Sequence, residues 1–274
     1  MSGTRIDKAI ILAAGMGKRI AGAGGPPKPL LPLDDSGSLT FLDWHLRALA
    51  AQGVREIYLV GSKATFDTKV AAMADHPATW IMNDFPGDVS GSGHSTHLAF
   101  TSGHDILDGK SRVVLMDADV VYDPSLFAEL AGPSPPTYAA PPRSKTLVCG
   151  RFRETDEEVM VFADDRGIPR LHGKGLLRTP MVRDLTCLGE ATGLLLLEPG
   201  DHAIWKAAAA WCMSFSTAKT RTEHEDITGR LLAMGALDAV VFADESRCME
   251  CDTPDEYEVV KKEMVPRWLG KLPR

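Results

Sequence analysis

Long hydrophobic runs and aromatic residues are both scarce in this sequence, and their scarcity excludes several classes of protein. A membrane-spanning helix needs about 20 consecutive apolar residues, and every apolar run here is far shorter, so we expect no membrane partner. Residues 1–8 are polar and lack the apolar core of a secretory signal peptide. Positive charge is also in deficit, and the formal net charge of −7 argues against nucleic acid as a general partner.

Cysteine is infrequent, and its positions lack the paired spacing of a metal site. The five cysteines are an odd number. Cys248 and Cys251 form one C-x-x-C pair, but neither a second pair nor a histidine pair accompanies it. We therefore expect free thiols with a mainly structural role in a reducing cytoplasm, and hence a cytoplasmic protein. The five are Cys149, Cys187, Cys212, Cys248 and Cys251.

Alternating strand and helix patterns fill the first half of the chain and predict an α/β fold. A length of 274 residues, of which 44% are hydrophobic, is enough for one large α/β domain. Thr40 and Asp43 form a capping box, apolar residues then recur at helical spacing, and Gly53 ends the helix. The alternation predicts a Rossmann-like, mostly parallel sheet with helices on both faces. The expected segments are strands at 54–60, 79–82 and 112–116, and helices at 65–74, 93–101 and 125–130.

Past Gly132 the pattern changes, because five prolines interrupt residues 133–142. Short strand-like segments follow at 146–152, 158–163 and 168–172, and we expect them to form a small antiparallel lid. Helical patterns return at 201–213, 226–234 and 254–263. Ligands of a parallel sheet bind beyond the carboxyl ends of its strands, and the charged groups described next fall at such ends.

The N-terminal segment has the composition of a phosphate-binding loop. An apolar run ends at Leu12 and leads into a small-residue turn with Gly15 and Gly17, which precede the basic residues Lys18 and Arg19. Glycines let the backbone approach a ligand closely, and consecutive N–H groups there bind anions. Lys28 follows on a proline-fixed loop, at residues 26–29. The segment predicts a triphosphate site.

Three other interpretations of this loop fit the residues less well. A Walker A loop requires G-x-x-x-x-G-K-[ST], which this sequence lacks. A dinucleotide fingerprint requires a third glycine where Ile20 stands, although Gly22 lies close. The third alternative is a glycine turn with incidental surface bases.

Two aspartates at the end of a buried strand form the second strong element. Asp117 and Asp119 follow the apolar run 113–116 and, being one residue apart, point the same way off the strand. Carboxylates so close together repel unless a cation or hydrogen bonds offset the charge. Magnesium suits this position because it accepts carboxylate and phosphate oxygens together. The alternative is a strand-end turn with helix-capping aspartates.

Further acidic groups lie downstream. Residues 223–226 are Glu-His-Glu-Asp and open a helix, where acidic residues are also favoured by the helix dipole alone. Asp252 follows a short strand and precedes Pro254 near a helix start. It is either an N-cap or a strand-end carboxylate that faces Asp119 and completes a magnesium site.

The order of these elements resembles the small cytidylyltransferases of the phosphocholine and phosphonate (2-aminoethylphosphonate) type, within the GT-A-like nucleotidyltransferases. The resemblance rests on L-A-A-G-x-G-x-R with P-K-P, on Asp-Ala-Asp at 117–119, on 189–193, on the acidic helix start and on Glu-x-Asp-Thr at 250–253. It spans nearly the whole chain. It implies a GT-A-like fold in a single domain, 1–274, with a nucleotide-binding half (1–132) and an acceptor-binding half that carries the lid (133–274).

The resemblance also implies roles for individual residues. Lys28 would stabilise the α-phosphoryl oxygens and Arg19 the leaving pyrophosphate, while Asp119 and Asp252 would hold Mg²⁺. The nucleotide, CTP, would contact Leu12, Ala13, Ala14, Gly15, Met16, Gly17, Lys18, Ser90, Gly91, Ser92, Gly93 and Asp117. The acceptor-binding candidates are Lys145, Lys174, Glu225, Asp226 and Glu250.

The acceptor is the least determined part. Relatives that bind choline carry aromatic residues beside the acids of the helix start, to hold a quaternary ammonium, and residues 223–226 have none. The lid region is rich in bases instead, which favours an anionic phosphonate. These bases are Arg143, Lys145, Arg151, Arg153, His172, Lys174 and Arg178. We interpret His94 and His97, one helical turn apart, as surface or core histidines.

The sequence therefore predicts a CTP-dependent cytidylyltransferase that couples CMP to a small phosphonate or phosphate monoester and releases pyrophosphate. Two alternatives stay open. One is a sugar-1-phosphate or inositol-phosphate nucleotidyltransferase, and the other is a catalytically silent nucleotide-binding regulator. Whether the chain forms a homodimer is also left open.

Overall fold

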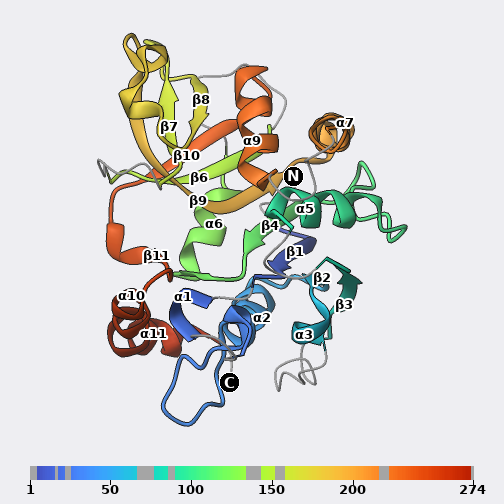
Figure 1. Cartoon of the computed structure of the whole chain (residues 1–274), viewed down its shortest axis with the longest axis vertical. Coiled ribbons are helices and arrows are strands. Elements are labelled where there is room, and N and C mark those ends of the chain that lie inside the picture. Colours follow the sequence, from blue (N-terminus) through green and yellow to red (C-terminus); the bar gives the residue numbers. More distant parts are fainter. Residues whose placement is uncertain are drawn as a thin grey trace.

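A computed structural model of the chain describes residues 5–15, 18–21, 26–66, 77–85, 90–133, 143–151, 158–215 and 222–272. Figure 1 shows how the elements are arranged in space. Of the residues singled out above, Met16, Gly17, Gly22 and Arg153 lie outside these ranges, as do residues 67–74 of the helix expected at 65–74 and the side chain of Lys18. None of the described helices is both long and apolar enough to cross a membrane.

One mixed sheet runs through the molecule in the order β10-β6-β9-β4-β1-β2-β3. Strands β1, β2, β3 and β4 are parallel to one another, β10 is parallel to β6, and β9 is antiparallel to β4 and β6. The hairpin β7–β8 is attached to β9, and β5 and β11 form a separate antiparallel pair. The strands are β1 (Lys8–Ala13), β2 (Glu56–Gly61), β3 (Thr79–Met82), β4 (Val113–Asp117), β5 (Val120–Tyr122), β6 (Lys145–Cys149), β7 (Met160–Ala163), β8 (Pro169–Gly173), β9 (Thr186–Leu197), β10 (Asp238–Phe242) and β11 (Cys248–Glu250).

Helices cover both faces of this sheet, as the sequence predicts. They are α1 (Lys18–Ala21), α2 (Phe41–Ala51), α3 (Lys63–Phe66), α5 (Ser92–Thr101), α6 (Ser125–Ala131), α7 (His202–Cys212), α9 (His224–Ala233), α10 (Pro254–Val259) and α11 (Val265–Trp268). A π-helical turn, Val260–Met264, joins α10 to α11, and 3₁₀ turns occur at Lys28–Leu30, Leu176–Arg178, Pro180–Val182, Pro199–Asp201, Glu245–Arg247 and Leu269–Lys271. The predicted capping box of α2 is confirmed, because Thr40 N donates to Asp43 Oδ2 (2.9 Å) and Asp43 N donates to Thr40 Oγ1 (3.1 Å).

The alternation of side chains along β1 divides the core into two layers. Ile11 packs in a cluster with α2, α6 and α11, and Ile10 packs on the opposite face with α5, α7 and α9. Because β1 is buried on both faces, its sequence reads as a continuous apolar run, as expected of a central parallel strand. This packing fixes the carboxyl ends of β1 and β4, where the phosphate loop and the aspartate pair begin.

The second half departs from the sequence-based expectation in one respect. The segment expected as part of the lid, 146–152, forms β6 (Lys145–Cys149) inside the main sheet, between β10 and β9. Only β7 and β8 form the antiparallel excursion, at one end of the molecule beside α9 (Figure 1). Strand β9, which the sequence did not predict, explains the difference. Its 12 residues pair with β4, β6 and β7, so both halves of the chain share one sheet.

Candidate active site

Lys28 lies at the centre of the site, between two carboxylates. It begins a 3₁₀ turn after Pro27 and is 5% exposed. Its Nζ donates to Asp119 Oδ2 and to Asp252 Oδ1, each at 2.9 Å. The second of these contacts joins residues 224 positions apart in the chain. The structure thus brings together the three residues for which the sequence predicted a phosphate and metal role.

Arg19 adds a second cation to this cluster. Its Nη2 lies 3.0 Å from Asp252 Oδ1, while most of its side chain is exposed at the mouth of the site. Burial lowers the pKa of Lys28, but the charges of Asp119 and Asp252 outweigh it and raise that pKa above its ordinary value. Burial raises the pKa of Asp252, yet Lys28 and Arg19 bring it below its ordinary value. Lys28 and Asp252 are therefore both charged at neutral pH.

The donor set at Asp119 and Asp252 fits a hard cation such as Mg²⁺. Two carboxylates from different elements converge on one ammonium group, which shows that their oxygens can share a positive charge at a single point. Within the described residues, no cluster of three or more His, Cys, Asp or Glu side chains could hold a metal. An ion at this point would complete its shell with phosphate oxygens and water, the usual arrangement for Mg²⁺.

Asp117 lies deeper, where β4 passes β9. Gly193 of β9 has φ +73°, and a Cβ there would lie 2.0 Å from Asp117 Oδ2. Glycine at 193 is therefore what leaves space for this carboxylate. Burial raises the pKa of Asp117 to about 8, and His224 opposes that shift while Asp119 adds to it.

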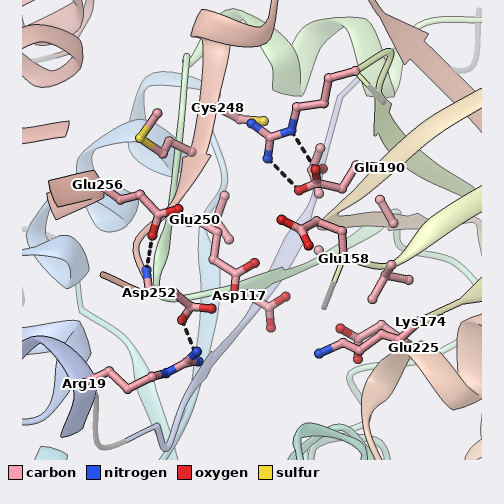
Figure 2. A pocket seen from close by; sticks show the side chains of 17 residues that line it. Arg19, Asp117, Glu158, Lys174, Glu190, Glu225, Cys248, Glu250, Asp252 and Glu256 are labelled. Atoms are coloured by element: carbon pink, nitrogen blue, oxygen red, sulfur yellow. Dashed lines mark hydrogen bonds and ion pairs between the residues drawn. The ribbon is translucent and has the colours of Figure 1, made fainter. Parts of the chain in front are cut away.

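A cavity of about 940 Å³, counting the part open to solvent, extends from this cluster toward the β7–β8 hairpin. Figure 2 shows it with Arg19 and Asp252 on one side and Lys174 and Glu225 on the other. Seven lining side chains are carboxylates and three are basic. The lining residues are Arg19, Asp117, Val120, Arg151, Glu158, Val159, Lys174, Glu190, Ala191, Thr192, Gly193, Glu225, Cys248, Met249, Glu250, Asp252 and Glu256.

Two of the three basic side chains in the cavity are engaged by carboxylates. Arg151 donates to Glu190 through Nε (2.7 Å) and Nη2 (2.5 Å), a bidentate and buried pair. Arg19 is held by Asp252. Burial raises the pKa of Glu250 to about 8, with Asp119 and Asp252 adding to the shift. Carboxylates still outnumber basic side chains in the lining when Asp117 and Glu250, with their raised pKa values, are left out of the count, so the lining is not basic as the lid sequence suggested.

The predicted acceptor residues divide into two groups. Lys174, Glu225 and Glu250 line the cavity. Lys145 does not, because its Nζ lies under β6 and donates to the backbone oxygens of Leu130 and Gly132. The lysine stands at the first position of a central strand, which the sequence placed in the lid. The placement of Lys145 in the acceptor site was therefore wrong.

Asp226 is also outside the cavity lining, since its Oδ2 accepts from Glu223 N (2.9 Å) and caps α9. This is the helix-start role that the sequence left open as an alternative. Of the lid bases, Arg143, His172 and Arg178 are likewise absent from the lining.

The glycines at positions 91 and 93 are explained by packing against Thr222. A Cβ on Gly91 would lie 2.1 Å from Thr222 O, and one on Gly93 would lie 2.8 Å from the same oxygen. Glycine here allows the chain before α9 to pack against the start of α5. The contact of this segment with the base remains a prediction. His94 is buried and packs edge-on against Phe85, with ring centroids 5.1 Å apart, as a core histidine does.

Sequence reasoning gave His224 and Glu190 no individual role in the site, and it named Arg151 only as one of the lid bases. His224 Nε2 lies 3.5 Å from Asp117 Oδ2, and its Nδ1 lies 3.1 Å from Glu225 Oε2. Its contacts with Ser92 join residues 132 positions apart, so no local pattern signals them. Glu190 lies within the 189–193 segment that carried the resemblance, which was the available signal.

Comparison with known proteins agrees with this geometry. Residues 9–194 match the family of MobA-like NTP transferase domains. No curated protein sequence matches the chain.

Solved structures with the same fold include several nucleotidyltransferases. The inositol-1-phosphate CTP transferase of T. maritima has a TM-score of 0.68 at 18% identity, covering 97% of this chain and 98% of that one. The CTP:phosphocholine cytidylyltransferase of Streptococcus pneumoniae has a TM-score of 0.68 at 15% identity, covering 94% and 98%. A glucose-1-phosphate thymidylyltransferase of Bacillus anthracis, described as putative, has a TM-score of 0.67 at 15% identity, covering 94% of each chain. At these identities the likeness shows the GT-A-like nucleotidyltransferase fold.

Proposed function

Because this chain belongs to the family of MobA-like NTP transferase domains and is a nucleotidyltransferase, we propose that its donor is CTP and its acceptor a small phosphate or phosphonate monoester. The observation that carries the proposal is Lys28, held between Asp119 and Asp252 beside the phosphate loop. CTP is favoured because two of the compared proteins, with the same fold over nearly their whole length, are described as using it.

In the proposed reaction an ionised oxygen of the acceptor attacks the α-phosphorus of CTP. A new P–O bond forms, the bond between the α-phosphorus and its bridging oxygen breaks, and pyrophosphate leaves with that electron pair. The attacking oxygen carries charge at neutral pH, so no general base is required. The residues therefore act by orienting the reactants and by neutralising charge in the transition state.

Lys28 and Arg19 supply the positive charge that this displacement requires. The Lys28 ammonium is fixed by two carboxylates, so it is oriented before the substrate binds. Arg19 is exposed at the mouth, where the departing pyrophosphate can exchange with solvent. Asp119 and Asp252 would hold Mg²⁺, which neutralises phosphate charge and orients the phosphoryl groups when bound.

The cavity charge favours an acceptor that carries an ammonium group beside its phosphoryl group. Carboxylates outnumber bases in the lining even when Asp117 and Glu250, whose pKa values burial raises to about 8, are left out of the count. Arg151 and Arg19 are already paired. None of the described residues that line the cavity is aromatic, and quaternary ammonium groups are usually bound by aromatic faces. We therefore propose a primary ammonium in place of the anionic acceptor expected from the sequence.

Pyrophosphate release tests the proposal directly. The enzyme with Mg²⁺ is given each of CTP, UTP, ATP and GTP, together with aminoalkyl phosphonates, amino-alcohol phosphates, a carboxylated phosphonate, inositol phosphate and sugar 1-phosphates. We expect CTP with an amine-bearing acceptor to give the highest kcat/KM. Turnover with a sugar 1-phosphate or inositol phosphate only would replace the proposed acceptor. Nucleotide binding with no pyrophosphate release from any pair would identify a regulator.

A further inference from the structure

His224 lies behind the cavity and contacts one carboxylate from each side of it. It is the first residue of α9, is 4% exposed and does not line the cavity. Asp117 Oδ2, at the end of β4, lies 3.5 Å from Nε2, and Glu225 Oε2 lies 3.1 Å from Nδ1. Asp117 and Glu225 both line the cavity, on the predicted nucleotide side and acceptor side respectively.

The backbone around His224 is fixed by a reciprocal cap between two helices. His224 N donates to Ser92 Oγ (2.8 Å) at the start of α5. In return Ser92 donates to Glu223 Oε2 through its backbone N (2.8 Å) and its Oγ (2.6 Å). The N–H groups at both helix starts are thereby satisfied. The backbone of His224 therefore cannot move away from α5 without breaking this cap.

Other buried histidines in the described structure make a different kind of contact. His202 Nδ1 accepts from Gly109 N (2.9 Å), and His45 Nε2 lies 3.2 Å from Ala118 O, so both rings bind backbone groups. The His224 ring instead lies between carboxylates, and Glu225 Oε2 is a buried oxygen without an aligned hydrogen bond in the described structure. Burial lowers the pKa of His224, but the charges of Asp117, Glu225 and Glu223 outweigh it and raise that pKa. Burial lowers the pKa of the nearby His172, and the charge of His224 lowers it further.

We propose that His224 is a positioning residue that sets the placement of Glu225, on the acceptor side, relative to Asp117, on the nucleotide side. The inference rests on the proposed function, because it concerns the alignment of that function's two substrates. Misplacement of reacting groups by about 1 Å can cost about 100-fold in rate. By contacting both Asp117 and Glu225, the His224 ring can hold the two sides of the cavity in a fixed relative position.

Two amide substitutions separate the two contacts of the ring. His224→Gln places an amide near the position of Nε2 and keeps a donor toward Asp117, while His224→Asn places one near Nδ1 and keeps the contact with Ser92 and Glu225. We expect His224→Gln to raise the acceptor KM by about tenfold with the CTP KM unchanged. We expect His224→Asn to lower kcat by about 100-fold with the acceptor KM unchanged.

His202→Gln is the matched control, because it alters a buried histidine that does not line the cavity and should leave kcat and both KM values unchanged. If both His224 variants behave as this control does, the inference is overturned. If they do not fold, Ser92→Ala replaces them. It removes the hydroxyl beside Nδ1 and should raise the acceptor KM by about tenfold, and an unchanged acceptor KM would overturn the inference.

The same experiment distinguishes the inference from the function on which it rests. If the wild type is active and the His224 variants have the same kcat and KM values as the wild type, the role of His224 is disproved and the proposed function is not. A wild-type enzyme that releases no pyrophosphate from any nucleotide and acceptor pair removes the proposed function, and the inference with it.

Discussion

Lys28 is a buried cation whose two partners are both carboxylates, and each partner also suits a metal ion. The ammonium and Mg²⁺ would share Asp119 and Asp252, so the lysine lowers the repulsion between these carboxylates. Removing the lysine therefore affects both charge in the transition state and the stability of the fold. The two effects can be measured separately.

For Lys28→Ala we expect a loss of about 10² to 10³ in kcat, the usual cost of removing one fixed charge from a transition state. The melting temperature should also fall, because Asp119 and Asp252 then face each other without a cation. Mg²⁺ should raise the melting temperature of the variant more than that of the wild type. The measurements are pyrophosphate release and thermal denaturation with and without Mg²⁺.

Lys262→Ala is the control, since Lys262 is exposed and paired only with Glu258, at 2.7 Å, in the described structure. It should match the wild type in both measurements. Wild-type turnover by Lys28→Ala would remove Lys28 from the proposed chemistry.

At the same scale, the sequence predicted that Lys28, Asp119 and Asp252 come together, and position at a strand end explains this for Asp119. Asp119 follows β4, a parallel strand, whose carboxyl end lies at the ligand-binding edge. Lys28 begins a 3₁₀ turn and Asp252 follows β11, which is antiparallel to β5, so for these two the prediction rested on the resemblance. Lys145 was misplaced because a basic residue beside a strand gives no sign of which way its side chain points. His224 was missed because its partners, Ser92 and Asp117, become neighbours only when α9 packs against α5.

Among the elements, the junction of α5 with the chain before α9 is a close backbone approach. Gly91 is the N-cap of α5, and Thr222 O occupies the space that a side chain would need. The sequence showed the glycine but not the reason for it. The capping box of α2, by contrast, is local, and it was predicted because Thr40 and Asp43 lie three positions apart.

Gly91→Ala should separate α5 from α9 and destabilise the protein by about 1–3 kcal/mol, the usual cost of overpacking. For a chain of this size the melting temperature should fall by about 2–4 °C per kcal/mol. Gly200→Ala is the control, because no atom lies within 4 Å of an added Cβ there and its φ is ordinary. An unchanged melting temperature for Gly91→Ala, measured by circular dichroism, would contradict the observed packing.

At the scale of the whole molecule, the alternating first half was predictable because each element is specified by its own periodicity. The second half was not, because β9 pairs with β4, β6 and β7, which are distant from one another in sequence. A strand of 12 residues with bulges toward β6 and β7 has no regular alternation to recognise. The position of β6 in the sheet follows from β9 and was missed for the same reason.

The dependence of global stability on pH has one contribution that can be isolated. Asp238, at the start of β10, is 1% exposed, and neither carboxylate oxygen has a hydrogen-bond partner in the described structure. Burial raises its pKa to about 6, although Arg143 and Lys145 oppose the shift. Because the folded state holds this proton more tightly than the unfolded state, Asp238 contributes stability that is fully present below pH 3.8. That contribution is lost as the pH rises through about 6.

Asp238→Asn should therefore be more stable than the wild type at pH 7, by about 2–3 kcal/mol, and nearly equal to it at pH 4. Comparing the two proteins cancels every other titrating group. Urea denaturation at both pH values measures the difference. A difference in the free energy of unfolding that is the same at pH 4 and pH 7 would contradict the assignment.

The β7–β8 hairpin has a consequence for how such a protein can change its substrate. Glu158 precedes β7 and Lys174 follows β8, so one contiguous segment of chain contributes both residues to the cavity. Strand β7 joins the main sheet through β9, and Lys28, Asp119 and Asp252 lie outside the segment. Replacing residues 158–174 as a unit would exchange part of the acceptor side and leave the donor side untouched. On the proposed function, this segment is a part of the acceptor side that can diverge or be transplanted independently, while Glu225 and Glu250 stay with the rest of the fold.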